Sequence, residues 1–328
     1  MELAGRRIVV TGGAGFIGSH VVDALVAQGA SVYVVDDLSV GSRDNVAAAI
    51  DEGAEIVVGD VRDPEFMRGA LEGAVAVIHM ACDNLRASLG NPMRTHDVNA
   101  TGTLVTALAA VQSRTERFVY VSSSEAYGTA RSVPMSEDHP LEPTTVYGAS
   151  KAAGELYAQG CMRTYGLPVT VIRPFNSYGP REHAHGTSAE VIPKFVTRIM
   201  AGLPPVIFGD GSQTRDFTWV EETARGIVAA TVSDALVGEA VNIAYGQGVS
   251  ILDIAERLRG ILEGGTETEY DAERPGDVMH HYADTRKARE MLGFAASIDI
   301  GEGLERYVRW VREHEDPVAA AAESLRNW

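Results

Sequence analysis

Six short runs in the first 175 residues are almost entirely apolar, and stretches with helical spacing separate them. Strands buried on both faces of a sheet have this pattern, because neither of their sides meets water. The runs are Arg7–Thr11, Ser31–Asp36, Glu55–Gly59, Ala74–Met80, Arg117–Ser122 and Val169–Arg173. Right-handed crossovers through the intervening helical segments would build a parallel sheet with helices on both faces. The sequence therefore predicts a doubly wound α/β domain over residues 1–175.

The regular alternation ends after Pro174. Short glycine- and proline-containing stretches follow, with five further helical patterns. These patterns are Ala189–Ala201, Glu221–Val232, Ile251–Leu262, Thr285–Leu292 and Gly301–Glu313. We expect a smaller C-terminal α/β lobe over residues 176–315, partly interleaved with the first domain, and a tail over 316–328. Because no long polar linker separates the two parts, they should share an interface, and the cleft between them is the expected site.

Composition excludes several classes of function. Lys and Arg number 28 against 45 Asp and Glu, giving a formal charge of −17 that repels nucleic acid and anionic membrane surfaces. Two cysteines, Cys82 and Cys161, are too few for a disulfide framework, so we expect a reducing, cytoplasmic setting. No apolar stretch approaches a membrane span, and the histidines at 183, 185, 280 and 281 lack the companions of a metal site. We therefore expect no metal.

A glycine cluster joins the first strand to the first helix. Gly12 would allow a tight turn, Gly15 a close approach of the backbone to a phosphate, and Gly18 close packing of helix on strand. Asp36 ends the second strand, where a carboxylate can accept both ribose hydroxyls of NAD and repel the 2′-phosphate of NADP. This is the pattern of a Rossmann domain that binds NAD. The competing interpretation is an ordinary tight turn, with Asp36 as a turn residue.

A second group of residues has the chemistry of a proton-transfer site. Tyr147 and Lys151 are four positions apart in a helical pattern, so they share one helix face. A phenol with a pKa near 10 becomes a base near neutrality only beside a cation, which Lys151 and an oxidised nicotinamide would supply. Ser123 and Glu125 follow the fifth strand, where a hydroxyl would reach the same substrate oxygen. Surface neighbours on a helix and a loop-capping serine cluster are the alternative interpretations.

Taken in order, the motifs TGGAGFIG, SSSEAYG, YGASK and RPFNSYGP resemble those of the extended short-chain dehydrogenases/reductases, in the NAD-dependent epimerase/dehydratase group. The resemblance implies that Phe16, Ile17, Asp60, Val61, Ala81 and Asn99 lie against NAD, and that Ser123, Tyr147 and Lys151 are catalytic. It further implies a nucleotide-diphosphate sugar held by Asn176, Ile192, Phe208, Arg215 and Arg274. Arginine suits a diphosphate because it makes bidentate contacts, although Arg215 and Arg274 could instead be surface partners of nearby aspartates. A homodimer is also expected from the resemblance.

The expected reaction is 4-epimerisation of a nucleotide sugar, of the UDP-hexose or UDP-hexuronate type. Tyr147 would take the proton of the 4-hydroxyl while hydride passes to NAD, and return of the hydride to the opposite face of the 4-ketose would invert C4. Glu125 keeps two alternatives open, because a carboxylate beside the catalytic hydroxyl resembles the base of 4,6-dehydratases, and the serine segment also resembles that of UDP-glucuronate decarboxylases. A catalytically silent NAD-binding protein on the same fold is the alternative from another class.

Overall fold

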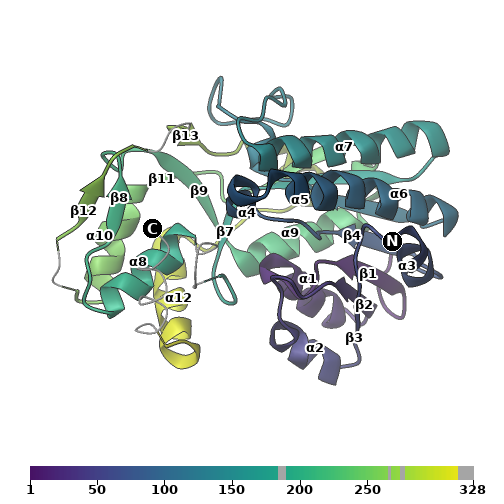
Figure 1. Ribbon diagram of the computed structural model, residues 1–328, viewed down its shortest axis with the longest axis horizontal. Coiled ribbons are helices and arrows are strands. Elements are labelled where there is room, and N and C mark those ends of the chain that lie inside the picture. Colours follow the sequence, from purple (N-terminus) through teal and green to yellow (C-terminus); the bar gives the residue numbers. More distant parts are fainter. Residues whose placement is uncertain (184–189, 265–266, 274–277, 317–328) are drawn as a thin grey trace.

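The computed structural model describes residues 1–183, 190–264, 267–273 and 278–316. Its largest element is a seven-stranded sheet in the order β10-β6-β5-β4-β1-β2-β3, and every pair of neighbours is parallel (Figure 1). The strands are β1 (Arg7–Thr11), β2 (Ser31–Asp36), β3 (Glu55–Val58), β4 (Ala76–His79), β5 (Arg117–Val121), β6 (Val169–Pro174) and β10 (Ala240–Ile243). The predicted doubly wound sheet is confirmed, and the strand order reverses on either side of β1.

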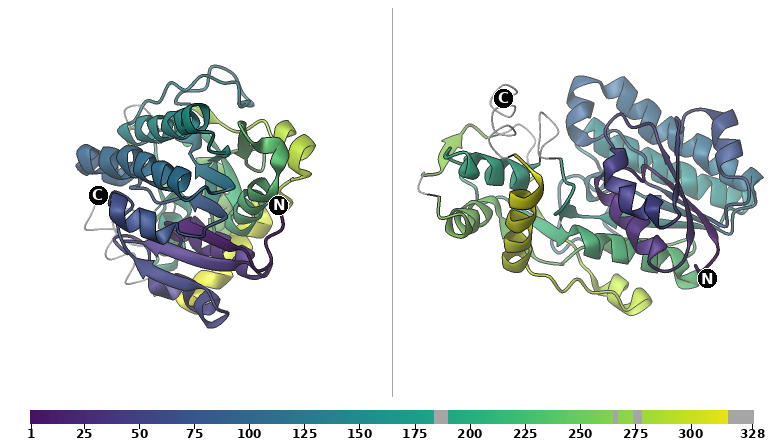
Figure 2. Two further views of the ribbon diagram at one scale, coloured as in Figure 1. Left: turned by 90° about the vertical axis from the view of Figure 1, so that its right-hand side faces the viewer. Right: turned by 90° about the horizontal axis from the view of Figure 1, so that it is seen from below.

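Helices cover both faces of this sheet. On one face, α1 (Phe16–Val26) packs against α9 (Val220–Val232), with α2 (Ala47–Asp51) and α11 (Arg286–Leu292) at the sides. On the other face lie α3 (Pro64–Ala70), α6 (Gly102–Gln112) and α7 (Val146–Tyr165), which Figure 2 shows from two further directions. Each face therefore has its own apolar core. Short helices α4 (Leu85–Gly90) and α5 (Pro92–His96) adjoin α7, and a single π-helical turn, η2 (Asp97–Thr101), connects α5 to α6.

The second lobe is built on two small sheets. One contains β7 (Asn176–Tyr178), β9 (Thr214–Trp219), β11 (Gly248–Ser250) and β13 (His280–His281); the other pairs β8 (Val206–Phe208) with β12 (Glu269–Asp271). Three amphipathic helices, α8 (Val191–Met200), α10 (Ile251–Ile261) and α12 (Ile300–His314), bury their apolar faces in a third core. Between β9 and β11 the chain returns to the large sheet as α9 and β10. The chain thus passes from the second lobe to the large sheet and back, and the expected domain bounds stay a prediction.

Short connecting elements complete the described chain. They are the 3-10 turns η1 (Arg43–Val46), η3 (Ser124–Ala126) and η5 (Asp234–Leu236). Among the described residues, no helix is both long and apolar enough to cross a membrane.

Candidate active site

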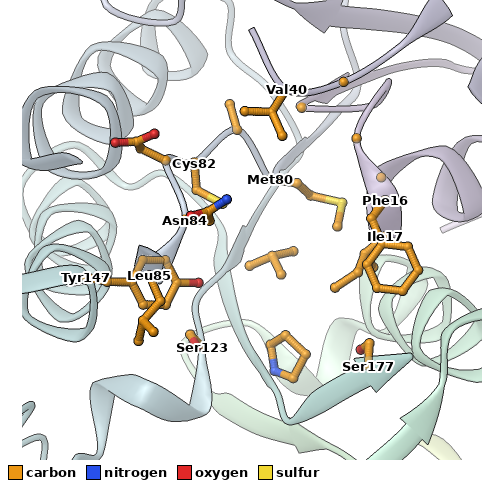
Figure 3. A pocket seen from close by; sticks show the side chains of 18 of the residues that line it. Phe16, Ile17, Val40, Met80, Cys82, Asn84, Leu85, Ser123, Tyr147 and Ser177 are labelled. Atoms are coloured by element: carbon orange, nitrogen blue, oxygen red, sulfur yellow. The ribbon is translucent and has the colours of Figure 1, made fainter. Parts of the chain in front are cut away.

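One cavity opens where the strands of the large sheet end, and both lobes contribute to its wall. Residues that follow β1, β2, β4, β5 and β6 line it, together with the loop after β7 and the start of α8. Figure 3 shows Tyr147 and Ser123 on one side of this space and Phe16 and Ile17 on the other. Ligands of doubly wound sheets bind at this edge, beside the reversal of strand order.

The glycine cluster forms a turn that only glycine fits. Gly12 has φ +70°, and a Cβ there would lie 2.7 Å from the Ala81 nitrogen. A Cβ on Gly18 would lie 2.1 Å from the Gly12 carbonyl oxygen, so the first turn of α1 packs directly on the loop. Gly15 is the N-cap of α1 and has no side-chain cap, which leaves backbone N–H groups directed at the cavity. A cofactor diphosphate therefore fits the cradle made by residues 12–18.

Asp36 lies at the end of β2, on the cavity wall. Its two carboxylate oxygens accept the Ala14 and Leu38 N–H groups at 3.0 and 2.9 Å, which fixes the side chain beside the glycine loop. Burial raises the pKa of this carboxyl. Further along the wall, Asp60 pairs with Arg62 at 2.6 Å, and Arg62 holds the pKa of Asp60 below its usual value. Asp60 and Val61 line the cavity, and their contact with the adenine of the cofactor stays a prediction.

The expected catalytic residues lie together. Helix α7 begins at Val146 because Thr145 caps it, its hydroxyl oxygen accepting the Gly148 N–H at 3.0 Å. Both Tyr147 and Lys151, one helical turn apart, then face the cavity. Ser123 caps η3, accepting the Glu125 N–H at 3.2 Å, and its side chain also lowers the pKa of Tyr147 through a hydrogen bond. The ammonium of Lys151 donates to the Val121 carbonyl oxygen at 2.7 Å.

Burial governs the pKa values of Tyr147 and Lys151 in the protein alone. It raises the pKa of the phenol, and nearby Cys82, Glu125 and Glu190 raise it further, whereas a hydrogen bond with Ser123 lowers it. Burial also lowers the pKa of Lys151, because desolvation disfavours both charged forms. The expectation that Lys151 and an oxidised nicotinamide together make the phenol acidic stays a prediction.

The remaining predicted residues divide into two groups. Phe16, Ile17, Ala81, Glu125, Asn176 and Ile192 line the cavity with the residues above. Asn99, Phe208 and Arg215 do not line it within the described part of the chain, and Arg274 lies outside the described residues, as do His185 and most of the tail.

Asn99 is a structural residue beneath the site. It is buried, its amide nitrogen donates to the Asp83 carbonyl oxygen and to Ser150 Oγ at 3.0 and 2.9 Å, and its amide oxygen accepts the Asp83 N–H. Arg215 donates to the backbone oxygens of Thr214 and Val278, which holds it along β9. Direct contacts of Asn99, Phe208 and Arg215 with ligands stay predictions.

Several cavity residues escaped prediction. Cys82, His183, Glu190 and Arg94 line the cavity although no motif in the sequence pointed to them. Glu182 lines it too, and its place three residues after the final glycine of RPFNSYGP was the available clue. His79 and Cys161 are buried.

Among the described residues, no three His, Cys, Asp or Glu side chains gather into a possible metal site. Cys82 and Cys161 are both free thiols, the first exposed and the second buried.

Comparisons with known proteins agree with this geometry. The profile of the family described as GDP-mannose 4,6 dehydratase matches residues 9–307. A UDP-glucose 4-epimerase from Mycolicibacterium smegmatis is 35% identical over 310 residues, covering 93% of this chain and 98% of the relative. The crystal structure of a Thermotoga maritima UDP-glucose 4-epimerase with UDP-glucose superposes with a TM-score of 0.88 at 34% identity, covering 94% of this chain and 99% of that one.

A dTDP-glucose 4,6-dehydratase from Streptomyces venezuelae, solved with NAD and TYD bound, superposes equally well. Its TM-score is 0.89 at 33% identity, with 95% of this chain and 99% of that chain covered. Proteins named for two different reactions are thus similar to this chain to nearly the same degree.

Proposed function

Because the chain belongs to the NAD-dependent epimerase/dehydratase family of extended short-chain dehydrogenases/reductases, we propose that it is a nucleotide-sugar 4-epimerase of the UDP-hexose or UDP-hexuronate type. One observation carries the proposal. A single cavity joins the glycine cradle and Asp36 to Ser123, Tyr147 and Lys151, and continues to Asn176 and Ile192 of the second lobe. Cofactor, reacting carbon and nucleotide therefore have adjoining places in one space.

In the proposed reaction, Tyr147 accepts the proton of the sugar 4-hydroxyl as C4 is oxidised, and returns it when C4 is reduced. Ser123 would hold the same oxygen, because its side chain lines the cavity with Tyr147 and lowers the pKa of the phenol. Lys151, whose ammonium donates to the Val121 carbonyl oxygen, would supply a positive charge in the same cavity. NAD is the cofactor, and when bound it supplies the hydride acceptor and donor.

Inversion also requires that the 4-ketose present its other face. The second lobe would hold the nucleotide through Asn176 and Ile192 while the sugar turns about the diphosphate. Because the hydride is returned, no external oxidant or reductant is consumed.

The test is direct assay of purified protein with UDP-glucose, UDP-galactose, their N-acetyl forms and UDP-glucuronate. We expect interconversion of one 4-epimeric pair at unchanged mass. Absence of an epimer from every pair would overturn the proposal.

A second candidate, 4,6-dehydration, is favoured by the position of Glu125. Its side chain lines the cavity and raises the pKa of Tyr147, so a carboxylate stands beside the reacting carbon. It could remove the C5 hydrogen of a 4-ketose. Ser124 precedes Glu125, at the position where related dehydratases often carry an aspartic acid and others a serine. A decarboxylase of UDP-glucuronate would use the same 4-keto stage.

The variant Glu125→Gln separates these reactions. A dehydratase should lose product yet still accumulate NADH with substrate, whereas an epimerase should retain turnover. Loss of a carboxylate that opposes phenolate formation should also lower the pKa of Tyr147, so the rising limb of the rate profile should move to lower pH. Mass spectrometry identifies the product, since water or carbon dioxide is lost only in the alternatives.

We also propose a homodimer, formed through α7 and its neighbours on the outer face. Leu156 and Tyr157 on α7 are 59% and 42% exposed, and Met93 on α5 is 67% exposed. These exposed apolar side chains lie on α5 and α7, two helices that contact each other, which supports an interface there. Light scattering should report twice the chain mass of 35.0 kDa, and the variant Leu156→Glu should have the mass of a single chain.

A further inference from the structure

The part of the cavity near Tyr147 is bordered by carboxyl groups from three separate elements. Glu125 lies on η3, Glu182 on the loop after β7, and Glu190 is the N-cap residue of α8. Glu125 and Glu190 both raise the pKa of Tyr147, and Glu190 also raises that of Glu182. Glu125 and Glu190 therefore act on the phenol at which the sugar would react, and Glu182 interacts with Glu190 on the same cavity wall.

Glu182 is the most enclosed of the three. Its side chain lines the cavity although the residue is only 5% exposed. One carboxyl oxygen accepts the Gly179 N–H at 3.2 Å, and the other makes no hydrogen bond within the described residues. Burial raises the pKa of Glu182 well above its usual value, and Glu190 raises it further. The carboxyl oxygen that does not accept Gly179 N–H can take part in a hydrogen bond with a bound group.

Cations are few around this part of the wall. Among the described residues, Arg94 and Lys151 are the Lys and Arg side chains that line the cavity. Arg94 lies with Asp37 and Asp83 at 3.6 and 3.9 Å, next to the end of β2. Lys151 is directed to the Val121 carbonyl.

Arg86 reduces the acidity of this region but is not among the residues that line the cavity. It pairs with Glu190 at 3.7 Å and lowers the pKa of Glu182, although the pKa of Glu182 is raised overall because burial has the larger effect.

Resting on the proposed function, we propose that the sugar is uncharged, a neutral hexose or N-acylhexosamine, and that Glu182 hydrogen-bonds one of its hydroxyl groups. A hexuronate would bring a carboxylate beside Glu125 and Glu190, into surroundings that already raise the pKa of Glu182. The same desolvation and repulsion act on a substrate carboxylate. The hexuronate type of epimerase and the decarboxylase are disfavoured for this reason.

The test compares UDP-glucose, UDP-N-acetylglucosamine and UDP-glucuronate, together with the thymidine diphosphate forms of glucose and glucuronate. Within the uridine set and within the thymidine set, all substrates share the base and the diphosphate. The ratio of kcat/KM for the glucuronate to kcat/KM for a neutral sugar of the same set therefore reports the effect of the sugar alone. We expect glucuronate to be at least about tenfold poorer than the neutral sugars, the order of effect of one like charge in a partly buried site. Glu190→Gln should raise the relative rate with glucuronate by a similar factor, whereas the exposed control Glu72→Gln, outside the cavity wall, should leave the ratio unchanged.

A second readout tests Glu182 itself. Glu182→Ala should raise KM for the neutral sugar more than it lowers kcat, and Glu182→Gln, which resembles the protonated carboxyl, should restore much of the loss. Equal or faster turnover of a glucuronate would overturn the inference and leave 4-epimerisation intact. If none of the nucleotide sugars reacts, the proposed function itself fails, and the inference falls with it.

Discussion

Replacing Gly18 by alanine tests whether the glycine cradle is the cofactor site. The added Cβ would lie 2.1 Å from the Gly12 carbonyl oxygen, 2.9 Å from Gly13 Cα and 3.0 Å from the Gly12 carbonyl carbon. All three atoms are backbone, so no side chain can rotate away, and the loop must move off the helix. Overpacking of this kind costs about 1–3 kcal/mol. Displacement of the N–H groups that face the diphosphate should weaken NAD binding by a similar free energy, about 5- to 150-fold in Kd.

The measurement is calorimetric titration of NAD, combined with urea unfolding of the protein without cofactor. Gly160→Ala is the matched control, because Gly160 lies inside α7 and a Cβ there meets nothing within 4 Å. That variant should be about 0.5–1 kcal/mol more stable and bind NAD normally. If Gly18→Ala binds NAD within twofold of the parent protein, residues 12–18 do not hold the cofactor, and the assignment of the cavity is refuted.

Three further predictions concern single side chains. Tyr147→Phe should abolish turnover and leave the Kd of NAD nearly unchanged, whereas Tyr157→Phe, ten residues along the same helix and 42% exposed, should remain active in the same coupled assay. Iodoacetamide should alkylate exposed Cys82 and spare buried Cys161, and saturating NAD and nucleotide sugar should slow the reaction, as peptide mass mapping will report; equal labelling of both thiols would contradict the structure. Burial lowers the pKa of His79 to about 3, below its usual value near 6.5, so His79 contributes stability that is complete above pH 6.5 and is lost as the pH falls towards 3. Between pH 7 and 5 the contribution of His79 to the free energy of unfolding should fall by about 2 kcal/mol. Urea unfolding at the two pH values should show this fall in the parent protein and not in the variant His79→Gln.

The sequence specified the large sheet well because its signals are local. The ends of β1 and β2 were predicted to the residue, since a continuous apolar run meets glycine or a turn at each end. Strand β10 was missed, because a run of four residues at 240–243 carries too little local signal to predict a strand. These residues form a strand only through pairing with β6, about 70 positions earlier. The stretch Met93–Gln112 has helical spacing throughout, and this spacing gives no warning of the π turn at Asp97–Thr101. That turn carries Asn99, which is why its amide reaches Asp83 and Ser150.

The residues of the candidate site likewise fall into those with a local sequence signal and those without one. Gly12, Tyr147 and Lys151 were found because their spacing within one loop or one helix carries the chemistry. Glu182 and Glu190 were not, since their position depends on how the loop between β7 and α8 folds over the sheet edge. No periodicity in the sequence encodes that placement.

The predicted pair Tyr147 and Lys151 and the carboxylates that the sequence did not reveal have opposing effects on the ionisation of the phenol. Burial and the carboxylates of Glu125 and Glu190 hold Tyr147 in its neutral form, and Lys151 is itself weakened as a cation by desolvation. A phenol with a raised pKa is protonated at neutral pH and cannot accept a proton from the substrate. The protein alone is therefore poorly prepared for the reaction. Under the proposed function, an oxidised nicotinamide held by the glycine cradle would supply a positive charge in the same cavity and favour the phenolate. The carboxylates on the wall would then keep the phenol protonated until the hydride acceptor is bound.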